Sequence, residues 1–339
     1  WSPSLAERAR ACRALKMLGP INGGQFALAL LVFSSPLFTN GTKVGQLTGH
    51  DPTEWSQSAL DDCLAGSTNP DAGSVVCNLK IYESAIQAAA QEGIELMVFP
   101  EAYGLAGNNV SFFEPLADIG TNPCHDMAPN DDDWSEIGTL YIQQNTLSCA
   151  AEESGVAIAA NIFTYVWDDY DFETQSATMH RYITEVVMDK TGTVVSYYHK
   201  HWLFPSETMV EPGPFAPTVF DMFGKKWGIV ICWEGFRADI EDDWSQYDGL
   251  VEQGATSLVW SIGFGAPKFP AKLDTQKTAI AVAKKYGVAV VSSVDTKFHI
   301  KGDAGFIDAS GGVISTSEAV LTGLPGEYTA KPAVHFADL

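Results

Sequence analysis

Four polar residues that can do chemistry stand at, or just beyond, the ends of strand-like stretches of this sequence: Glu101, Lys200, Glu207 and Cys232. In mixed α/β folds, ligands bind at the ends of strands. Cys232 is of particular interest because it closes the buried-looking stretch 227–233 and has no obvious disulfide partner. A thiol is a strong nucleophile toward a carbonyl carbon once a neighbouring base takes its proton. The four residues together therefore mark a candidate functional site, with Cys232 as its candidate nucleophile.

Each of the four also has an ordinary structural explanation. A glutamate after a strand is usually a solvated rim residue, a lysine there is usually exposed, and a cysteine in an apolar strand is usually a small core residue. The functional interpretation therefore depends on the combination and on elements that bring the side chains together.

Those elements follow from the hydrophobic pattern. Apolar runs that end at Gly or Pro alternate with amphipathic segments. Helices are expected at 79–93, 140–154 and 275–287, and buried strands at 25–38, 94–101, 155–163, 227–233, 256–263 and 288–294. Hairpins are expected at 182–200 and 302–315, and a surface loop at 164–176. This order indicates an α/β fold, an αββα sandwich of two mixed β-sheets flanked by helices. The first expected strand has no GxGxxG after it, which argues against a dinucleotide fold.

The composition excludes some classes of partner. The formal net charge of −22 disfavours nucleic acid, because an acidic surface repels phosphate. The most apolar stretch, 25–38, is shorter than the roughly 20 residues that span a bilayer. Basic residues precede it, as in a signal peptide, and we favour a buried strand over that alternative.

The cysteines and two glycosylation sequons favour the secretory pathway. Asn40 and Asn109 begin Asn-X-Thr/Ser sequons. Cys63 and Cys77 bracket a loop rich in Gly, Ser, Asn and Pro that a disulfide would close. No CxxC pair is present, so a zinc site is not expected. Cys12 is left without an assignment.

Three motifs in order resemble the carbon–nitrogen hydrolase (nitrilase) superfamily. They are "VFPEAYG" with Glu101, "YYHKHWLFPSE" with Lys200 and Glu207, and "FGKKWGIVICWE" with Cys232. The chain looks most similar to the secreted biotinidase and vanin (pantetheinase) branch, because a "PC" loop and an "LSC" helix lie between the first two motifs. It differs in reading Cys-Trp-Glu where that branch usually reads Cys-Phe-Asp. Since it stops soon after Ser315, we also expect it to lack the branch's additional C-terminal domain.

The resemblance implies a thioester mechanism. Cys232 would attack an amide carbonyl, and Glu101 would act first as general base and then as general acid. Lys200 and the backbone N–H of Trp233 would hold the oxyanion, and Glu207 would orient Lys200 and the substrate. No metal or organic cofactor is needed. His199 and His201 flank Lys200, but no third ligand with suitable spacing stands near them.

The family also suggests a pocket, a disulfide and domain bounds. Four aromatic residues fall where the family builds its acyl pocket, although each has the alternative of ordinary core: Trp233, Trp260, Phe264 and His299. The "PC…LSC" pair implies a disulfide between Cys124 and Cys149. Residues 1–24 are expected as a leader, 25–317 as the hydrolase domain and 318–339 as a C-terminal tail.

Three functions remain open at this point. The first is a secreted amidase that acts on a small linear amide, such as pantetheine or a biotin amide. The second is a nitrilase, suggested by Cys-Trp-Glu. The third is a catalytically silent glycoprotein with the same fold. A homo-oligomer paired through the helix after Cys232 is a further expectation from the family.

Overall fold

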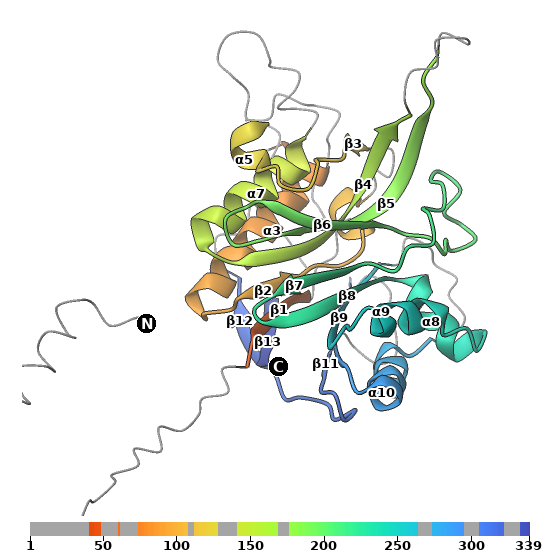
Figure 1. Cartoon of the computed structure of the whole chain (residues 1–339). Helices are drawn as coiled ribbons and strands as arrows, with labels where there is room; N and C mark the ends of the chain where they lie inside the picture. Colours follow the sequence, from red (N-terminus) through yellow and green to blue (C-terminus); the bar gives the residue numbers. More distant parts are fainter. Residues whose placement is uncertain are drawn as a thin grey trace, which may run out of the picture. The chain divides into compact units, whose positions relative to one another are not determined.

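A computed structural model describes residues 41–48, 60–61, 74–107, 112–127, 141–168, 176–263, 273–294, 305–321 and 333–339 (Figure 1). The predicted first strand at 25–38 and the predicted leader at 1–24 lie outside these ranges. So do Cys12, Asn40, Cys63, Asn109, Phe264 and His299. Among the described residues, no helix combines the length and the apolar character that crossing a membrane requires.

Two mixed β-sheets form the centre of the fold. The first has eight strands, with β3 pairing with β4 beside the path β12-β13-β1-β2-β4-β5-β6. Its strands are β1 Lys43–Thr48, β2 Leu96–Val98, β3 Glu114–Pro115, β4 Ala157–Trp167, β5 Met179–Met188, β6 Val194–His199, β12 Ser317–Val320 and β13 Ala333–Asp338. The second has the order β11-β10-β9-β8-β7. Its strands are β7 Val219–Met222, β8 Lys225–Ile231, β9 Ser257–Ile262, β10 Ala289–Val294 and β11 Phe306–Ile307.

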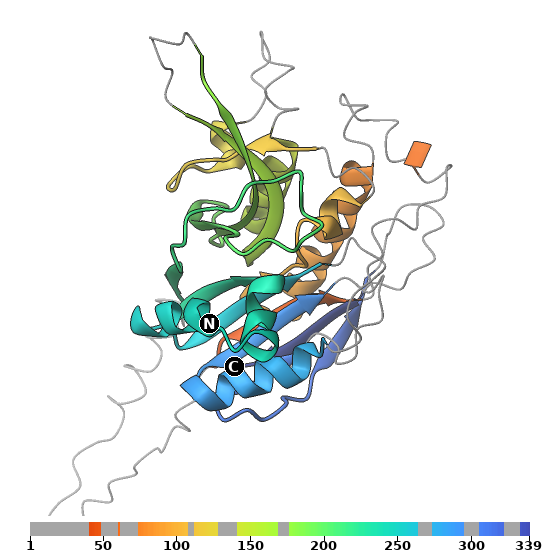
Figure 2. The ribbon, with the colours of Figure 1, turned by 90° about the vertical axis from the view of Figure 1, so that its right-hand side faces the viewer.

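Helices cover the outer face of each sheet. Helices α3 (Ser74–Gln91) and α7 (Ile142–Ser154) pack on the first sheet, and α8 (Trp233–Ile240), α9 (Ser245–Glu252) and α10 (Thr275–Tyr286) pack on the second (Figure 2). Short helices α4 (Tyr103–Ala106) and α5 (Pro123–Asp126) lie in connections. The expected αββα sandwich of two mixed sheets is confirmed.

Continuous apolar runs become strands that are buried on both faces. In β2, Leu96 and Val98 belong to the core between the sheets, whereas Met97 belongs to the core under α3 and α7. Side chains of a strand alternate between its two faces, so a strand between two layers needs apolar residues at every position. This is why such runs signal buried strands in the sequence.

The structure corrects two expectations about segment boundaries. The sequence predicts a surface loop at 164–176, but β4 continues to Trp167 and pairs with β5 from Ile158 to Trp167. The segment 318–339 was expected to be a tail, but β13 pairs with β1 over six positions and β12 pairs with β13. These strands are parts of the first sheet because their backbone groups complete its ladder. The strand β1 itself was not predicted.

Candidate active site

Lys200 lies at the centre of a buried cluster of charged side chains. Its backbone follows β6, and its side chain is fully buried. The Nζ atom donates to Glu101 Oε1 and to Glu207 Oε1, each at 2.6 Å. Charge-assisted hydrogen bonds of this length compensate part of the cost of burying the three groups. The structure thus brings three of the four predicted polar residues into direct contact.

Backbone N–H groups from two segments of the chain hold the main chain and the side chain of Glu101 in place. It lies three residues beyond the end of β2, and its backbone carbonyl accepts a hydrogen bond from Gly104. Its Oε2 atom accepts a hydrogen bond from the N–H of Gly263, at 3.1 Å, just after β9. A Cβ atom at position 263 would lie 2.8 Å from the Glu101 Cβ, so this contact requires glycine.

Cys232 occupies the turn between β8 and α8. Its φ of 42° is unusual for a non-glycine residue, and such a conformation persists only where the surroundings impose it. Three hydrogen bonds do so. The Cys232 N–H donates to Ser261 O at 2.8 Å, and the Cys232 carbonyl accepts from Trp260 Nε1 and from the Gly235 N–H, both at 3.1 Å. The Sγ atom points to the Gly263 carbonyl at 3.4 Å, beside Glu101.

Glu207 extends the cluster from the loop that follows Lys200. Its Oε1 atom binds Lys200 and its Oε2 atom accepts from the Phe204 N–H at 2.7 Å. The side chain is almost completely buried. A carboxylate bound on both oxygens in this way holds the lysine ammonium in a fixed position.

Burial and charge set the protonation states. Burial raises the pKa of Glu101 to about 8, against the opposing effect of Lys200. Burial alone would lower the pKa of Lys200, but the carboxylates of Glu101 and Glu207 raise it well above its ordinary value. Burial and the Glu101 carboxylate raise the pKa of the Cys232 thiol. The resting site therefore contains a lysine cation and a protonated thiol, and the thiol needs a base to become a nucleophile.

Glu234, the last residue of Cys-Trp-Glu, is buried and engaged by four hydrogen bonds. Its Oε1 atom accepts from the Tyr198 hydroxyl at 2.7 Å and from the His201 and Trp202 N–H groups, and its Oε2 atom accepts from the Ile231 N–H at 3.0 Å. It thereby ties the chain just after Lys200 to the strand just before Cys232. The glutamate of Cys-Trp-Glu thus has a structural role here: it connects two segments of the site by hydrogen bonds.

Two of the expected pocket residues are described. Trp260 is buried, packs on Phe236 at a ring-centroid distance of 4.8 Å, and donates its indole N–H to Cys232. It therefore belongs to the core behind the turn. Trp233 is partly exposed at the start of α8 and packs edge-on against Phe204.

One aromatic residue of the site was not predicted. Tyr103 follows Glu101 by two residues, is partly buried, and packs at right angles on Phe163. Burial and the carboxylates of Glu207 and Glu101 raise the pKa of Tyr103. Its hydroxyl is therefore a neutral donor next to the charged cluster. The only sequence signal for it is its place within "FPEAYG".

The two histidines beside Lys200 have partners within the fold. His199 Nδ1 lies 2.8 Å from Thr184 Oγ1, and burial lowers the pKa of His199 to about 4. His201 Nδ1 lies 2.6 Å from the Gly213 carbonyl. Both rings thus use Nδ1 to hold neighbouring strands and loops.

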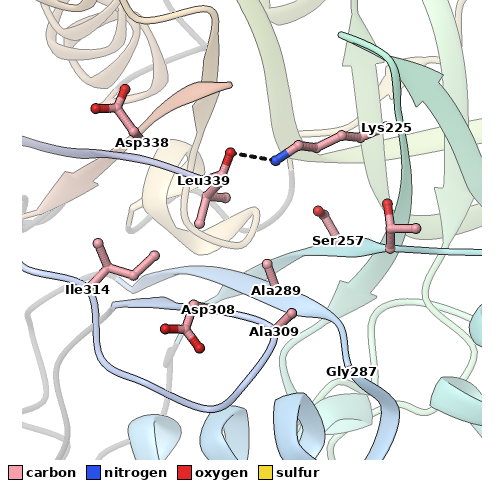
Figure 3. Close-up of a pocket in the computed structure, with 10 residues that line it drawn as sticks. Lys225, Ser257, Gly287, Ala289, Asp308, Ala309, Ile314, Asp338 and Leu339 are labelled. Atoms are coloured by element: carbon pink, nitrogen blue, oxygen red, sulfur yellow. Dashed lines mark hydrogen bonds between the residues drawn. The ribbon is translucent and has the colours of Figure 1, made fainter. Parts of the chain in front are cut away.

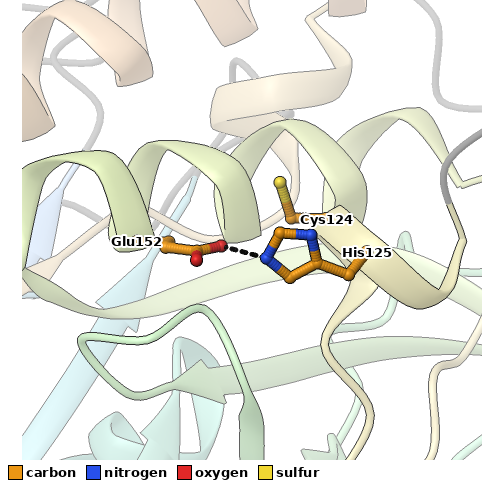
Figure 4. Close-up of side chains that lie close together, drawn as sticks. All are labelled: Cys124, His125 and Glu152. Carbon is orange, nitrogen blue, oxygen red and sulfur yellow. Dashed lines mark ion pairs between the residues drawn. The ribbon is translucent and has the colours of Figure 1, made fainter.

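The expected disulfide between Cys124 and Cys149 is present and joins α5 to α7. In the described part of the chain, one group of three potential metal ligands includes a cysteine of this disulfide: Cys124, His125 and Glu152 (Figure 4). His125 Nε2 pairs with Glu152 at 2.7 Å. Because the Cys124 sulfur is bonded to Cys149, it offers no thiolate, and the group does not match a structural metal site. The predicted Cys63–Cys77 bridge stays a prediction.

A cavity of about 370 Å³ lies at the other end of the second sheet (Figure 3). Its walls include Lys225, Ser257 and Ala289, which stand at the amino ends of β8, β9 and β10. Cys232 and Gly263 follow the carboxyl ends of β8 and β9. The cavity is therefore separate from the buried cluster.

The profile of the family described as carbon-nitrogen hydrolase matches residues 69–239, half of the 339-residue chain. The matched segment contains all four residues of the cluster. The chain belongs to the carbon–nitrogen hydrolase family.

Curated relatives include pantetheinases and biotinidases. The chain is 30% identical to the pantetheinase of Canis lupus familiaris over 168 residues and 32% identical to that of Homo sapiens over 167 residues. It is 29% identical to the biotinidase of Bos taurus over 168 residues. These matches cover 46% of this chain but only 30–31% of each relative. The matched part thus spans about a third of the length of these relatives.

Solved structures confirm the fold. A cysteine-to-serine mutant of an amidase of the nitrilase superfamily from Nesterenkonia superposes with a TM-score of 0.54 at 14% identity, covering 89% of this chain and 93% of that mutant. A mutant of that amidase, with the acetamide moiety of fluoroacetamide added covalently at its active-site cysteine, superposes with a TM-score of 0.53 at 15% identity. That superposition covers 88% of this chain and 92% of the mutant.

Proposed function

We propose that this protein is a thiol-dependent hydrolase that cleaves the C–N bond of a small linear amide through a thioester on Cys232. The observation that carries the proposal is the buried contact of Lys200 with Glu101 and Glu207, beside a cysteine on a strained turn. Membership of the carbon–nitrogen hydrolase family and similarity to pantetheinases and biotinidases support it.

The reaction begins with attack of Cys232 Sγ on the amide carbonyl carbon. Glu101 takes the thiol proton as the C–S bond forms. The carbonyl oxygen becomes an oxyanion, which the Lys200 ammonium and the Trp233 N–H stabilise. The tetrahedral intermediate collapses, the C–N bond breaks, and Glu101 returns the proton to the departing amine.

Water completes the cycle. Glu101 takes a proton from a water molecule that attacks the thioester carbonyl, and the C–S bond then breaks to release the carboxylic acid. The proton passes back to Cys232. Glu207 keeps Lys200 in place throughout, because it stays bonded to the ammonium while Glu101 changes its protonation state.

The nitrilase alternative uses the same residues on a carbon–nitrogen triple bond. It was suggested by Cys-Trp-Glu, but the carboxylate of Glu234 is engaged by a hydroxyl and three backbone groups. The motif therefore brings no additional group to the reacting carbon, and we favour the amide.

A hydrolysis screen tests the proposal. Pantetheine, a biotinyl amide, simple aliphatic amides and aliphatic nitriles are offered to the purified protein, and released amine or ammonia is measured. We expect turnover of at least one amide, and loss of that turnover in Cys232→Ala and Glu101→Gln. Glu114→Gln is the matched control, because Glu114 is an equally buried carboxyl outside the cluster. Turnover of nitriles alone would reject the amidase, and an inactive wild type would favour the silent glycoprotein.

We also propose that the protein matures in an oxidising compartment. The Cys124–Cys149 bridge supports this, since such bonds persist in secreted proteins. Asn40 and Asn109 are the proposed glycosylation sites. Treatment of the protein from a eukaryotic secretion host with an N-glycosidase should lower its mass, and an unchanged mass would argue against glycosylation.

A further inference from the structure

Glu185 is a fully buried carboxyl in the middle of β5 that the proposed reaction does not use. Its Oε2 atom accepts from Asn161 Nδ2 at 2.9 Å, and its Oε1 atom lies 3.0 Å from Ser261 Oγ. Both partners are neutral. Burial raises the pKa of Glu185 to about 8, which shows how strongly this environment opposes a charge.

Each partner of Glu185 leads to one side of the candidate active site. Asn161 Oδ1 accepts from the N–H of Ala102, the residue next to Glu101, at 2.9 Å. Ser261 accepts the Cys232 N–H on its backbone carbonyl at 2.8 Å. A continuous path therefore connects the Glu101 segment, Asn161, Glu185, Ser261 and the Cys232 turn.

This path crosses from one sheet to the other. Asn161 is in β4 and Glu185 in β5, both in the first sheet, whereas Ser261 is in β9 of the second. Glu101, the proposed general base, follows β2 of the first sheet, and Cys232, the proposed nucleophile, follows β8 of the second. Apolar packing between sheets is non-directional and does not by itself set their relative position to a fraction of an ångström. Hydrogen bonds at a fixed length supply that restraint.

We propose that Glu185 is a positioning residue that sets the placement of Cys232 relative to Glu101. The proposal rests on the proposed function for the identity of the base and the nucleophile. Glu185 touches neither of them and acts through Asn161 and Ser261. Its contribution is the pair of hydrogen bonds, and a negative charge is not required.

Two substitutions separate hydrogen bonding from charge. Glu185→Gln keeps the shape and retains both bonds, since its carbonyl can accept from Asn161 and its NH₂ can donate to Ser261. Glu185→Met has a similar length but retains neither bond. Glu114→Gln and Glu114→Met are the matched pair at a buried carboxyl that instead binds the start of α7.

Three quantities are measured for each variant: kcat and KM on the amide found in the screen, the rate of Cys232 alkylation by iodoacetamide followed by mass spectrometry, and the temperature of unfolding. We expect Glu185→Met to lower kcat and the alkylation rate about 10- to 100-fold, the effect of a displacement of roughly an ångström, while KM stays within about threefold. Glu185→Gln should stay within about threefold of wild type on all three. Glu114→Met should lower only the temperature of unfolding.

The result that overturns the proposal is a Glu185→Met protein that loses stability like Glu114→Met but keeps kcat and alkylation near wild type. A Glu185→Gln protein as impaired as Glu185→Met would also overturn it, because charge would then be the essential property. Alkylation needs no substrate, so the alkylation rate of Cys232 tests the positioning role of Glu185 even if no amide is hydrolysed. An inactive wild type or an active Cys232→Ala contradicts only the proposed function.

Ser261→Ala tests the same hydrogen-bond path in case the Glu185→Met protein does not fold. It removes one hydroxyl and should lower the alkylation rate by about three- to tenfold, the loss expected for one hydrogen bond. Added to Glu185→Met in a folded double variant, it should have no further effect, because residues acting through one path are not additive. An unchanged alkylation rate in the single variant, or full additivity in the double variant, would count against the path.

Discussion

Lys200 is held in the interior of the protein by two carboxylates, Glu101 and Glu207. Burial raises the pKa of Glu101, and the neighbouring Glu207 carboxylate adds to that rise, whereas the Lys200 ammonium opposes it. Such an arrangement suits a residue that must take and return a proton near neutral pH, since a general base works best when its pKa lies near the working pH. Lys200 stays charged over the same range and is available for an oxyanion.

The first prediction concerns the pH dependence of the proposed reaction. Glu101 has to be ionised to take the thiol proton, and its pKa is about 8. We therefore expect kcat/KM to rise about tenfold per pH unit below pH 8 and to level off above it. The measurement is a profile of kcat/KM from pH 5.5 to 10 on the amide identified by the screen.

Alkylation of Cys232 by iodoacetamide provides the control for this profile. It should show the same rise in wild type and lose it in Glu101→Gln, where no base remains. A rise centred near pH 4.5, or a loss of activity immediately above pH 8, would contradict the assigned protonation states.

At the scale of elements, the Cys124–Cys149 bridge lies where α5, α7 and the β5–β6 turn meet. Ser148 Oγ donates to the Gly192 carbonyl in that turn at 2.7 Å and lies 2.9 Å from Asn122 Oδ1 beside α5. The bridge therefore fastens the outer helix layer. The buried cluster is built from strand ends of the two sheets, on the far side of the first sheet from α7.

The second prediction concerns this bridge. Replacing Cys124 and Cys149 by Ala should lower the free energy of unfolding by about 3 kcal/mol, because the bridge closes a loop of 25 residues. The value of kcat should remain within about twofold, since no group of the cluster is bonded to α5 or α7 in the described structure. Urea unfolding of wild type and variant, each with and without reductant, measures the effect. Reductant should destabilise wild type more than the variant, in which only the predicted Cys63–Cys77 bridge is left to reduce. A large loss of kcat in the variant would show that the helix layer contributes to the site.

At the scale of the whole molecule, buried carboxyls make stability depend on pH. Glu114 binds the N–H groups of Gln143 and Gln144 and the Gln144 side chain, all at 2.9 Å, and burial raises its pKa from 4.5 to about 7. Below pH 4.5 the group is protonated in both states and its contribution is fully present. As the pH rises toward 7, the unfolded chain loses the proton first, so stability is lost.

The third prediction concerns this fall in stability with rising pH. The free energy of unfolding should fall by about 3 kcal/mol between pH 4.5 and 7 through Glu114 alone. Glu114→Gln should be less stable at pH 5, because an amide nitrogen cannot accept the helix N–H groups, but its stability should fall less steeply with pH. Urea midpoints at pH 5, 6, 7 and 8 test this, with the exposed Glu153→Gln on α7 as control. Parallel curves for Glu114→Gln and wild type would show that Glu114 does not titrate in this range.

Much of this molecule was predictable from its sequence. The run 94–101 contains β2 and the run 227–233 overlaps β8, because a strand between two layers must be apolar on both faces. The helix expected at 275–287 corresponds to α10, which begins at the Asp274 cap and ends at Gly287. Periodicity and end signals are local, so the sequence alone determines the type and order of such elements. Glu101, Lys200 and Cys232 could be recognised as candidates because a polar residue at the end of an apolar run is also a local feature of the sequence.

Only the tertiary structure decided which distant groups meet. Glu185 and Glu234 look like surface residues in the sequence, yet each is buried and joins segments that flank the site. Gly263 is essential only because the Glu101 side chain packs against it, and β13 belongs to the first sheet only because β1 is its neighbour. Local sequence patterns carry no information about such partners. The contacts between Glu101, Lys200, Gly263 and Cys232 arise when two sheets bury their shared apolar faces, and that packing sets the distances on which the proposed chemistry depends.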